Sequence, residues 1–492
     1  MREICLHDTL SGSVKALEPR EPGQVGIYVC GPTVYGRAHV GNARPFVVFA
    51  LLKRFLEHEG YEVTLVENVT DVNDKIYDAA RAMGIGSEEL AAQMTAHYEQ
   101  DTDRLGLGRP DHEPKAASSV DGIVELIQAL IDSGNAYAAG GDVYFRVASY
   151  EGYGKLSNRP GDEMQQGDGD DAADRKESPR DFALWKAHKE EEDTAWPAPW
   201  GEGRPGWHIE CSAMAEQLLG TDFEIHGGGS DLVFPHHENE IAQTEAARGR
   251  PLARIWMHNG MVQMGAEKMA KSEGNIRALH GALDEHGRDA LIMYFVAGHY
   301  RQPIAFSAEA LEEAGRAVDR VRELCRRLEP GGEQLEALDE HAERFFDALA
   351  DDFNTAAARA VLFEWVSEAN RRLAAGERPA PGRFAEMLYA LGLEGLLEGA
   401  AEEADPEAER LLAEREQARD ARDFARADRL RDELGSRGYE VRDTADGARL
   451  VRGLQGGAVP PLDAGGLQRG ALPPFDAGGL QRGAVPPFDE LR

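Results

Sequence analysis

The sequence predicts an α/β fold built on a doubly wound parallel sheet, with an inserted domain, followed by an α-helical bundle and a small C-terminal unit. Three observations indicate this fold: a strand–helix–strand pattern near the start, a stretch that favours helices from residue 308 to 399, and the length of 492 residues. A chain of this length forms roughly three folding units at the usual size of domains. Its apolar fraction of 42% allows a large core.

The strand–helix–strand pattern opens the predicted sheet. Residues 25–29 are apolar and β-prone, and the Cys-Gly-Pro sequence at 30–32 ends the run. An apolar stripe at helical spacing follows, and we place Pro45 in the first turn of that helix, where proline is tolerated. Residues 62–66 alternate like a strand. Two strands joined through a helix are expected to lie parallel in one sheet.

The remaining elements follow from periodicity and from turn residues. We expect a helix over 120–131, an exposed Gly/Asp-rich loop over 161–178, helices over 308–399 with a break at 378–381, an acidic linker over 400–409, a helix over 414–434, and strands over 439–441 and 449–451. The last forty residues repeat with a period of 13 that pairs Gly-Gly with Pro-Pro. Such short units cannot bury a core, so we expect residues 453–492 to be disordered.

Charge and composition restrict the class of protein. The net charge is −34, which on its face opposes nucleic-acid binding. Residues 413–452, however, carry ten arginines and ten acidic residues, so this stretch is locally neutral. No apolar run approaches the roughly 20 residues that span a bilayer, and the N-terminal residues lack the layout of a signal peptide. Four scattered cysteines favour a reducing compartment, so we expect a cytoplasmic protein.

Two short segments far apart in the chain together predict a nucleotide site. The first, His39-Val40-Gly41-Asn42, follows the first strand and therefore lies where open α/β sheets bind ligands. The second is Lys268-Met269-Ala270-Lys271-Ser272. An imidazole, backbone N–H groups at a helix start and a pair of lysines suit the triphosphate of ATP. In this order and at about this separation, the two segments resemble the HIGH and KMSKS signatures of class I aminoacyl-tRNA synthetases.

Four residues have the chemistry of a metal site. Cys30 ends the first strand, Cys211 lies far along the chain, and the i,i+4 spacing from His236 to Glu240 places both side chains on one helix face. Two cysteines, a histidine and a glutamate form a tetrahedral zinc set. From the spacing alone an alternative is equally strong, in which the thiols are small buried hydrophobes and the histidine is a satisfied core group.

Longer motifs resemble those of cysteinyl-tRNA synthetases, and the similarity runs from the first residues to about Arg452. They are CGPTVY at 30–35, NVTDVNDK at 68–75, GWHIECSAM at 206–214, HGGGSD at 226–231 and FPHHENE at 234–240. The resemblance implies that zinc is bound by Cys30, Cys211, His236 and Glu240 and takes the thiolate of the substrate directly. A thiophilic metal separates cysteine from serine, which an apolar pocket would discriminate only ~10–200-fold.

The same resemblance implies roles for the other site residues. The cysteine pocket contains Cys30, Thr70, Trp207 and His226, with Asp231 near the ribose or the amino group. ATP, accompanied by Mg²⁺, is bound by Gly31, Thr33, His39, Gly41, Asn42, Lys268 and Lys271, of which His39, Asn42, Lys268 and Lys271 are the expected catalytic residues. Two positions depart from the signatures, Asn42 for the second histidine and Ala270 for the middle serine. We expect both to affect the rate and not the reaction.

The resemblance also implies the organisation of the chain. The expected parts are a Rossmann-type catalytic domain in two halves (1–118 and 201–275), a connective domain (119–200), a stem-contact region (276–335), a helical bundle (336–399), a linker (400–410), an anticodon-binding unit (411–452) and the tail (453–492). The implied activity joins L-cysteine, through cysteinyl-adenylate, to the 3′-terminal adenosine of tRNA(Cys). We expect a monomer that does not contact membranes.

Two other functions remain open from the sequence. One is the related ligase that joins cysteine to a glucosaminyl-inositol amine, which has no need of a C-terminal tRNA-binding unit. The other is a non-catalytic tRNA- or zinc-binding relative, in which His39 and the two lysines would be free to vary.

Overall fold

A computed structural model describes residues 2–159, 174–264, 267–268, 277–329, 331–397, 406–421, 423–437, 439–444 and 447–452. The chain divides into two compact units, residues 1–402 and 403–492. The repeat tail at 453–492, most of the predicted loop at 161–178 and most of the acidic linker lie outside the described residues.

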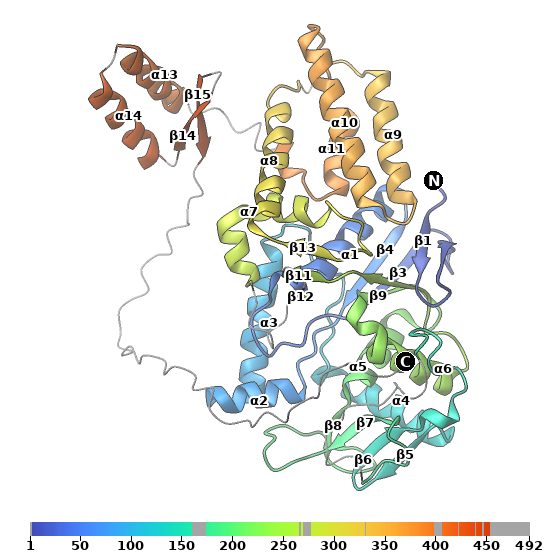
Figure 1. The fold of residues 1–492 in the computed structure, drawn as a ribbon. Coiled ribbons are helices and arrows are strands. Elements are labelled where there is room, and N and C mark those ends of the chain that lie inside the picture. Colours follow the sequence, from blue (N-terminus) through green and yellow to red (C-terminus); the bar gives the residue numbers. More distant parts are fainter. Residues whose placement is uncertain are drawn as a thin grey trace, which may run out of the picture. The chain divides into compact units, whose positions relative to one another are not determined.

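A four-stranded parallel sheet forms the centre of the first unit (Figure 1). Its strands stand in the order β10 (Ala253–Asn259), β9 (Phe223–Gly229), β3 (Gln24–Val29), β4 (Glu62–Glu67). All three neighbouring pairs are parallel, and Ile27 of β3 pairs with Leu65 on one side and Ile225 on the other. The predicted strand–helix–strand unit is confirmed. Because β3 and β9 are remote in sequence, the carboxyl ends of two separate halves of the chain meet at this point of the sheet.

Helix α1 (Val40–His58) joins β3 to β4 and packs its apolar stripe, which includes Phe49, Leu52 and Phe55, into the main core. The prediction for Pro45 is wrong, because the helix already begins at Val40 and Pro45 is its sixth residue. Proline has no N–H to donate to the carbonyl four residues earlier, so the Gly41 carbonyl lacks this intrahelical hydrogen bond.

The inserted domain has its own antiparallel sheet, in the order β5-β6-β7-β8. Its elements are η1 (Ala117–Ser119), α4 (Val120–Asp132), β5 (Ala136–Ala139), β6 (Asp142–Phe145), η2 (Val147–Ser149), β7 (Phe182–Ala187) and β8 (Gly203–Pro205). A separate core contains Ile123 and Ile127 of α4 with Phe145, Phe182 and Trp185 of the sheet. The predicted helix over 120–131 is confirmed.

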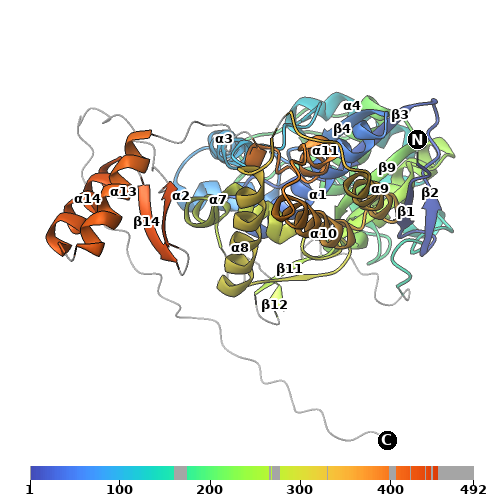
Figure 2. The ribbon, with the colours of Figure 1, turned by 90° about the horizontal axis from the view of Figure 1, so that it is seen from above.

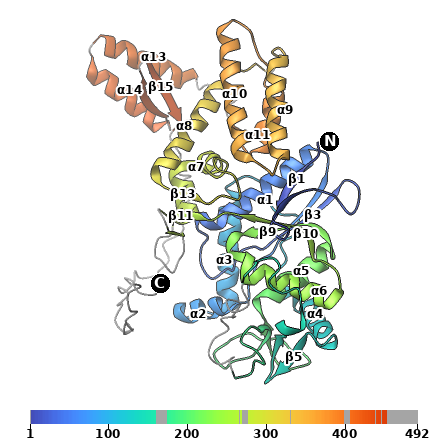
Figure 3. The same cartoon turned by 45° about the vertical axis from the view of Figure 1, so that its right-hand side comes forward.

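Other elements surround the parallel sheet. They are the hairpin β1 (Cys5–Asp8) and β2 (Ser13–Ala16), then α2 (Asp74–Met83), α3 (Ser87–Asp103), α5 (Trp207–Leu219), η5 (Ser230–Leu232), η6 (Val233–His237), α6 (Glu238–Arg248) and α7 (Leu279–Phe295). A small sheet of β12 (Glu267–Lys268), β11 (Val262–Met264) and β13 (Ile304–Phe306) has β11 at its centre, in contact with α1 (Figure 3).

Helices follow the small sheet, as the sequence predicts. They are α8 (Ala308–Cys325), α9 (Glu336–Ala350), α10 (Thr355–Ala374) and α11 (Gly382–Ala390), and Figure 2 shows α9, α10 and α11 gathered together. The predicted break at 378–381 separates α10 from α11. The side chain of Asn354 caps α10 by accepting the Ala357 N–H at 3.0 Å.

The second unit contains α13 (Pro406–Asp420), α14 (Phe424–Ser436) and the antiparallel pair β14 (Tyr439–Thr444) and β15 (Gly447–Arg452). The two strands confirm the prediction. The single helix predicted over 414–434 is wrong, because Asp423 caps a new helix by accepting the Arg426 N–H at 3.1 Å. Helix α13 also begins earlier than the expected end of the linker.

Among the described residues, no helix combines the length and the apolar character needed to cross a membrane.

Candidate functional site

A cluster of metal-binding side chains lies at the carboxyl end of the parallel sheet. Cys30 directly follows β3, Cys211 belongs to α5, His236 lies in the short helical segment η6, and Glu240 is in the first turn of α6. One donor atom from each lies within 4.8 Å of the others. The Cys30 Sγ is 3.3 Å from Glu240 Oε1, and the His236 Nε2 is 3.2 Å from the same oxygen. The four residues predicted from the sequence are therefore adjacent in space.

Burial determines the protonation of this cluster. All four residues are buried, and burial raises the pKa of the Cys30 thiol well above its usual range and also raises the pKa of Cys211. Burial lowers the pKa of His236 well below its usual value, so its imidazole is neutral. A neutral imidazole binds a metal through its free nitrogen, and a bound cation stabilises thiolates that burial otherwise disfavours.

The donor set fits a divalent metal. Two sulfurs, one imidazole and one carboxylate are the ligand types of tetrahedral zinc sites. The other nitrogen of His236, Nδ1, lies 2.9 Å from Nδ1 of His208, which directs Nε2 toward Glu240. A hydrogen bond to the second ring nitrogen is the usual way in which a ligating histidine is oriented.

A second donor set overlaps the first and includes a residue that sequence reasoning did not single out. Cys30 and Glu240 also lie within 4.8 Å of His226 and His237. The His226 Nε2 is 2.9 Å from Glu240 Oε2, so the residue predicted for the cysteine pocket directly contacts a predicted metal ligand. Residue His237 stands beside His236 in the same motif, and this adjacency was the signal that could have identified it.

Asn68 connects the parts of the site and was also missed as a single residue. Its Oδ1 accepts the Gly31 N–H at 3.0 Å and lies 3.6 Å from Cys211 Sγ, while its amide donates to Thr70 Oγ1 at 3.3 Å. Gly31 approaches so closely that an added Cβ would lie 1.8 Å from the Asn68 carbonyl oxygen. Only glycine fits there, because any side chain would collide with the backbone that follows β4.

The other residues predicted for the cysteine pocket surround the cluster. Trp207, at the start of α5, stacks on His236 with ring centroids 4.4 Å apart. Thr70 is buried, and its backbone pairs with that of Thr33 in a parallel bridge. Asp231 lies in the turn η5, which follows the carboxyl end of β9.

The predicted nucleotide residues at the start of α1 lie at the same end of the sheet. His39 is the residue that precedes the helix, and its backbone N–H donates to Asn42 Oδ1 at 3.1 Å. An added Cβ at Gly41 would lie 2.9 Å from the His39 ring, so glycine leaves room for that imidazole. The side chain of Asn42 therefore caps the start of the helix.

The second signature is described in part. Lys268 belongs to β12, where it pairs with Gln263 of β11, while Lys271 and Ala270 lie outside the described residues. The chain returns to α1 immediately after this segment, because Ala278 forms a bridge with His39 and the Val40 N–H donates to the Arg277 carbonyl at 3.0 Å. Residues 277 and 278, which follow the second signature in the chain, therefore contact the start of the first.

Comparisons with known proteins agree with this geometry. Residues 16–316 match the model of the tRNA synthetases class I (C) catalytic domain, residues 344–393 the DALR domain, and residues 401–450 the cysteinyl-tRNA ligase anticodon binding domain. A solved methionyl-tRNA synthetase of Mycobacterium tuberculosis, in complex with methionyl-adenylate, superposes with a TM-score of 0.57 at 15% identity, covering 77% of this chain and 90% of that one. The fold is that of the class I aminoacyl-tRNA synthetases.

Two curated relatives narrow the class. Cysteine–tRNA ligase of Caldicellulosiruptor saccharolyticus is 45% identical over 462 residues, which is 91% of this chain and 99% of the relative. Cysteine–tRNA ligase of Halorhodospira halophila is 46% identical over 458 residues, with 91% and 99% covered. The chain belongs to the cysteine–tRNA ligase family.

Proposed function

We propose that this protein activates L-cysteine with ATP to cysteinyl-adenylate and transfers the cysteinyl group to the 3′-terminal adenosine of tRNA(Cys). The observation that carries the proposal is the buried cluster of Cys30, Cys211, His236 and Glu240, which lies beside a helix start suited to ATP. Membership of the cysteine–tRNA ligase family supports the same reaction.

The cluster is proposed to hold one zinc ion, which when bound supplies a site for the thiolate of the substrate. Serine has no thiol, so selection of cysteine would depend on a bond between metal and sulfur and not on a packing contact alone. Trp207 and His226 contact residues of the cluster, and Asn68 links Thr70 to the cluster. These three residues are therefore proposed to line the cysteine pocket. The buried walls exclude water, which strengthens each polar contact with the substrate.

The nucleotide part of the site is proposed to act by position and charge. The backbone at Gly31 and Thr33 closes over the end of β4, while His39, Gly41 and Asn42 present the start of α1 to the phosphates of ATP with its Mg²⁺. Lys268 and Lys271 are proposed to neutralise the pyrophosphate as it leaves. Under this proposal the carboxylate of cysteine attacks the α-phosphorus, and the protein supplies no nucleophile of its own.

The C-terminal parts are proposed to bind tRNA. The matches of residues 344–393 and 401–450 support a helical bundle at 336–399 and an anticodon-binding unit at 411–452. The assignments of residues 119–200 to a connective domain and 276–335 to a stem-contact region belong to the same proposal. The protein is proposed to work as a monomer in the cytoplasm, and its four free cysteines suit a reducing compartment.

Attachment of labelled cysteine to tRNA tests the function. We expect acid-precipitable label when the protein is incubated with ATP, Mg²⁺, cysteine and bulk tRNA, and no label from serine. Transfer of cysteine to a glucosaminyl-inositol amine in place of tRNA would contradict the proposal. Absence of both ATP–pyrophosphate exchange and tRNA charging in folded, metal-loaded protein would indicate a non-catalytic relative.

A further inference from the structure

Arg44 is a completely buried arginine in α1, two residues after Asn42. Buried arginines are rare unless a partner compensates the lost hydration. Within the part of the chain that the structure describes, no carboxylate forms an ion pair with Arg44. Burial lowers the pKa of its guanidinium to about 10, so the side chain remains charged at neutral pH.

Backbone carbonyls take the place of a carboxylate. Nη1 donates to Gly260 at 2.6 Å and to Met261 at 3.0 Å. Nη2 donates to Tyr300 at 3.1 Å and to Gln302 at 2.6 Å, with the His299 carbonyl at 3.4 Å. A charged donor makes stronger hydrogen bonds than a neutral one, and the planar guanidinium orients all of its acceptors at once.

These carbonyls mark the points where the chain reaches the small sheet. Gly260 and Met261 directly precede β11, and residues 299–302 end one residue before β13, the strand that pairs with β11. The two segments are also bonded to each other, through the Gly260 N–H to the Tyr300 carbonyl at 2.8 Å. The Arg44 side chain therefore attaches the β11 side of the small sheet to the helix that begins at the first signature.

The stretch from 262 to 278 is thus bonded to α1 at both of its ends. At its far end the Leu279 N–H donates to the Ala38 carbonyl at 3.0 Å, and Ala278 bridges to His39. The hydrogen bonds of that attachment are between backbone groups, whereas the hydrogen bonds from α1 at the near end come from one side chain, Arg44. Lys268 of β12 lies between the two attachments.

We propose that Arg44 is a positioning residue, which fixes the strand pair carrying Lys268 relative to the helix start carrying His39 and Asn42. The inference rests on the proposed function, because it assumes that both signatures contact the same ATP. Lysine at this position keeps the charge but cannot hold five carbonyls in one plane. A small displacement of a charged group at a reacting phosphate can lower the rate about 100-fold.

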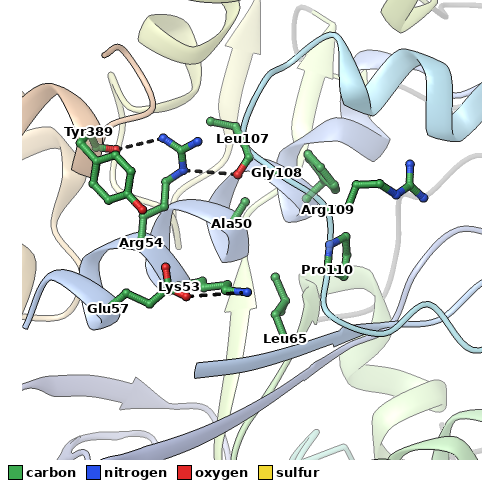
Figure 4. Close-up of a pocket in the computed structure, with 11 residues that line it drawn as sticks. Ala50, Lys53, Arg54, Glu57, Leu65, Leu107, Gly108, Arg109, Pro110 and Tyr389 are labelled. Atoms are coloured by element: carbon green, nitrogen blue, oxygen red, sulfur yellow. Dashed lines mark hydrogen bonds and ion pairs between the residues drawn. The ribbon is translucent and has the colours of Figure 1, made fainter. Parts of the chain in front are cut away.

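Arg54 provides a matched control in the same helix. It is also buried, and it also donates to backbone carbonyls, those of Leu107 at 3.3 Å and Tyr389 at 3.2 Å (Figure 4). It donates further to the Gly106 carbonyl at 3.1 Å and to Glu394. These partners belong to the loop before Pro110, to α11 and to the segment that follows α11. The cavity of about 190 Å³ that Arg54 lines contains none of the proposed site residues. The variant Arg54→Lys therefore reproduces the loss of buried bonds without touching the two signatures.

The experiment compares Arg44→Lys with Arg54→Lys in cysteine-dependent ATP–pyrophosphate exchange. For Arg44→Lys we expect kcat to fall by about 100-fold while KM for cysteine changes less than about twofold, since the cysteine pocket is untouched. For Arg54→Lys we expect a lower melting temperature and unchanged exchange constants. If both variants lose stability and both retain the wild-type kcat, Arg44 is structural and the proposal is overturned.

Two further measurements keep the result decisive. If Arg44→Lys does not fold, Gly260→Ala displaces the same junction, because an added Cβ would lie 2.4 Å from the Gln302 carbonyl carbon and oxygen; the same split between kcat and KM is expected. If the wild type shows no exchange with cysteine, the proposed function fails, and equilibrium binding of ATP alone tests Arg44. We then expect a dissociation constant at least about fivefold higher for Arg44→Lys than for Arg54→Lys, and equal values would overturn the proposal.

Discussion

Cys211 is the residue at which metal binding and cysteine selection are expected to fail together. Its thiol is buried beside Asn68 and completes the four-residue cluster. Cys211→Ser replaces a soft sulfur ligand with an oxygen. Mutation of a residue that only hydrogen-bonds to a metal ligand already lowers metal affinity about 10–100-fold, so the loss of a ligand should cost more. We predict zinc binding weakened by more than about 100-fold and loss of cysteine-dependent exchange, measured by chelator competition and by the exchange assay.

Cys325→Ser is the control for this variant, because that thiol is buried in α8 away from the cluster. We expect it to keep both the zinc and the exchange activity. Tight zinc binding in the Cys211→Ser protein would contradict the ligand assignment.

Asn42 shows how one residue can depart from a signature and still serve the helix. Its Oδ1 accepts the His39 N–H, which would otherwise be unsatisfied at the helix start. We predict that Asn42→Ala lowers the free energy of unfolding by about 1 kcal/mol, the usual cost of a lost cap, and also slows adenylate formation. Chemical denaturation and pyrophosphate exchange measure the two effects.

A second capping residue separates stability from chemistry. Asn354→Ala removes the cap of α10 in the helical bundle and is expected to cost a similar free energy with unchanged exchange. Equal losses of exchange activity in the two variants would show that Asn42 acts only through stability.

At the scale of elements, a buried pair joins α3 to the sheet. The Tyr98 hydroxyl of α3 donates to Glu67 at the end of β4. Burial raises the pKa of Glu67 to about 7, although the hydrogen bond from Tyr98 and the charge of Arg109 lower it, because burial outweighs them and the charge of Glu113 adds to the rise. An acid whose pKa is higher in the folded state binds its proton more tightly there. The contribution of Glu67 to stability therefore rises as the pH falls from about 7 toward 4.5.

The difference in unfolding free energy between the wild type and Glu67→Gln tests this prediction. Between about pH 8 and pH 5 we expect the wild type to gain up to about 3 kcal/mol relative to the variant, at 1.36 kcal/mol for each pKa unit. Denaturation with urea at several pH values measures the difference. Parallel pH profiles for the two proteins would mean that Glu67 is not titrating in this range.

The same scale shows what periodicity can predict. The strands at 25–29 and 62–66 and the helix over 120–131 follow from local apolar patterns, and the structure confirms them. The break between α13 and α14 does not follow from such a pattern, because the residues on both sides of Asp423 have the composition of a helix. Only the cap that the Asp423 side chain provides separates the two helices. Pro45 was misplaced for a similar reason, since the helix begins at Val40 before its apolar stripe does.

The proximity of site residues could be predicted from the sequence only where the functional side chains lie within a few residues of one another. His236 and Glu240 are one helical turn apart, so their proximity follows from local geometry. Asn68 and Arg44, in contrast, gain their partners from segments far along the chain, and each looks ordinary in its own sequence context. Such contacts depend on strand order and on the crossing of α1 over the sheet, which a single sequence does not reveal.

At the scale of the whole molecule, the division into two units predicts that cysteine activation and tRNA binding can be separated. All the proposed site residues lie within residues 1–402, whereas the match to the anticodon binding domain covers 401–450. A chain that ends at residue 402 should therefore retain cysteine-dependent pyrophosphate exchange within about twofold. Charging of tRNA should fall by at least about 100-fold, which corresponds to the loss of about 3 kcal/mol of binding free energy.

A chain that ends at Arg452 is the control for this truncation, because it keeps both units and lacks only the period-13 repeats. Since short Gly/Pro-rich units cannot bury a core, their removal should leave exchange, charging and melting temperature unchanged. Loss of exchange in the chain ending at 402 would show that the second unit supports the catalytic domain directly. Loss of charging in the chain ending at 452 would instead assign tRNA binding to the repeats. The stretch at 413–452, although locally neutral, would then not be enough to bind tRNA in a protein with a net charge of −34.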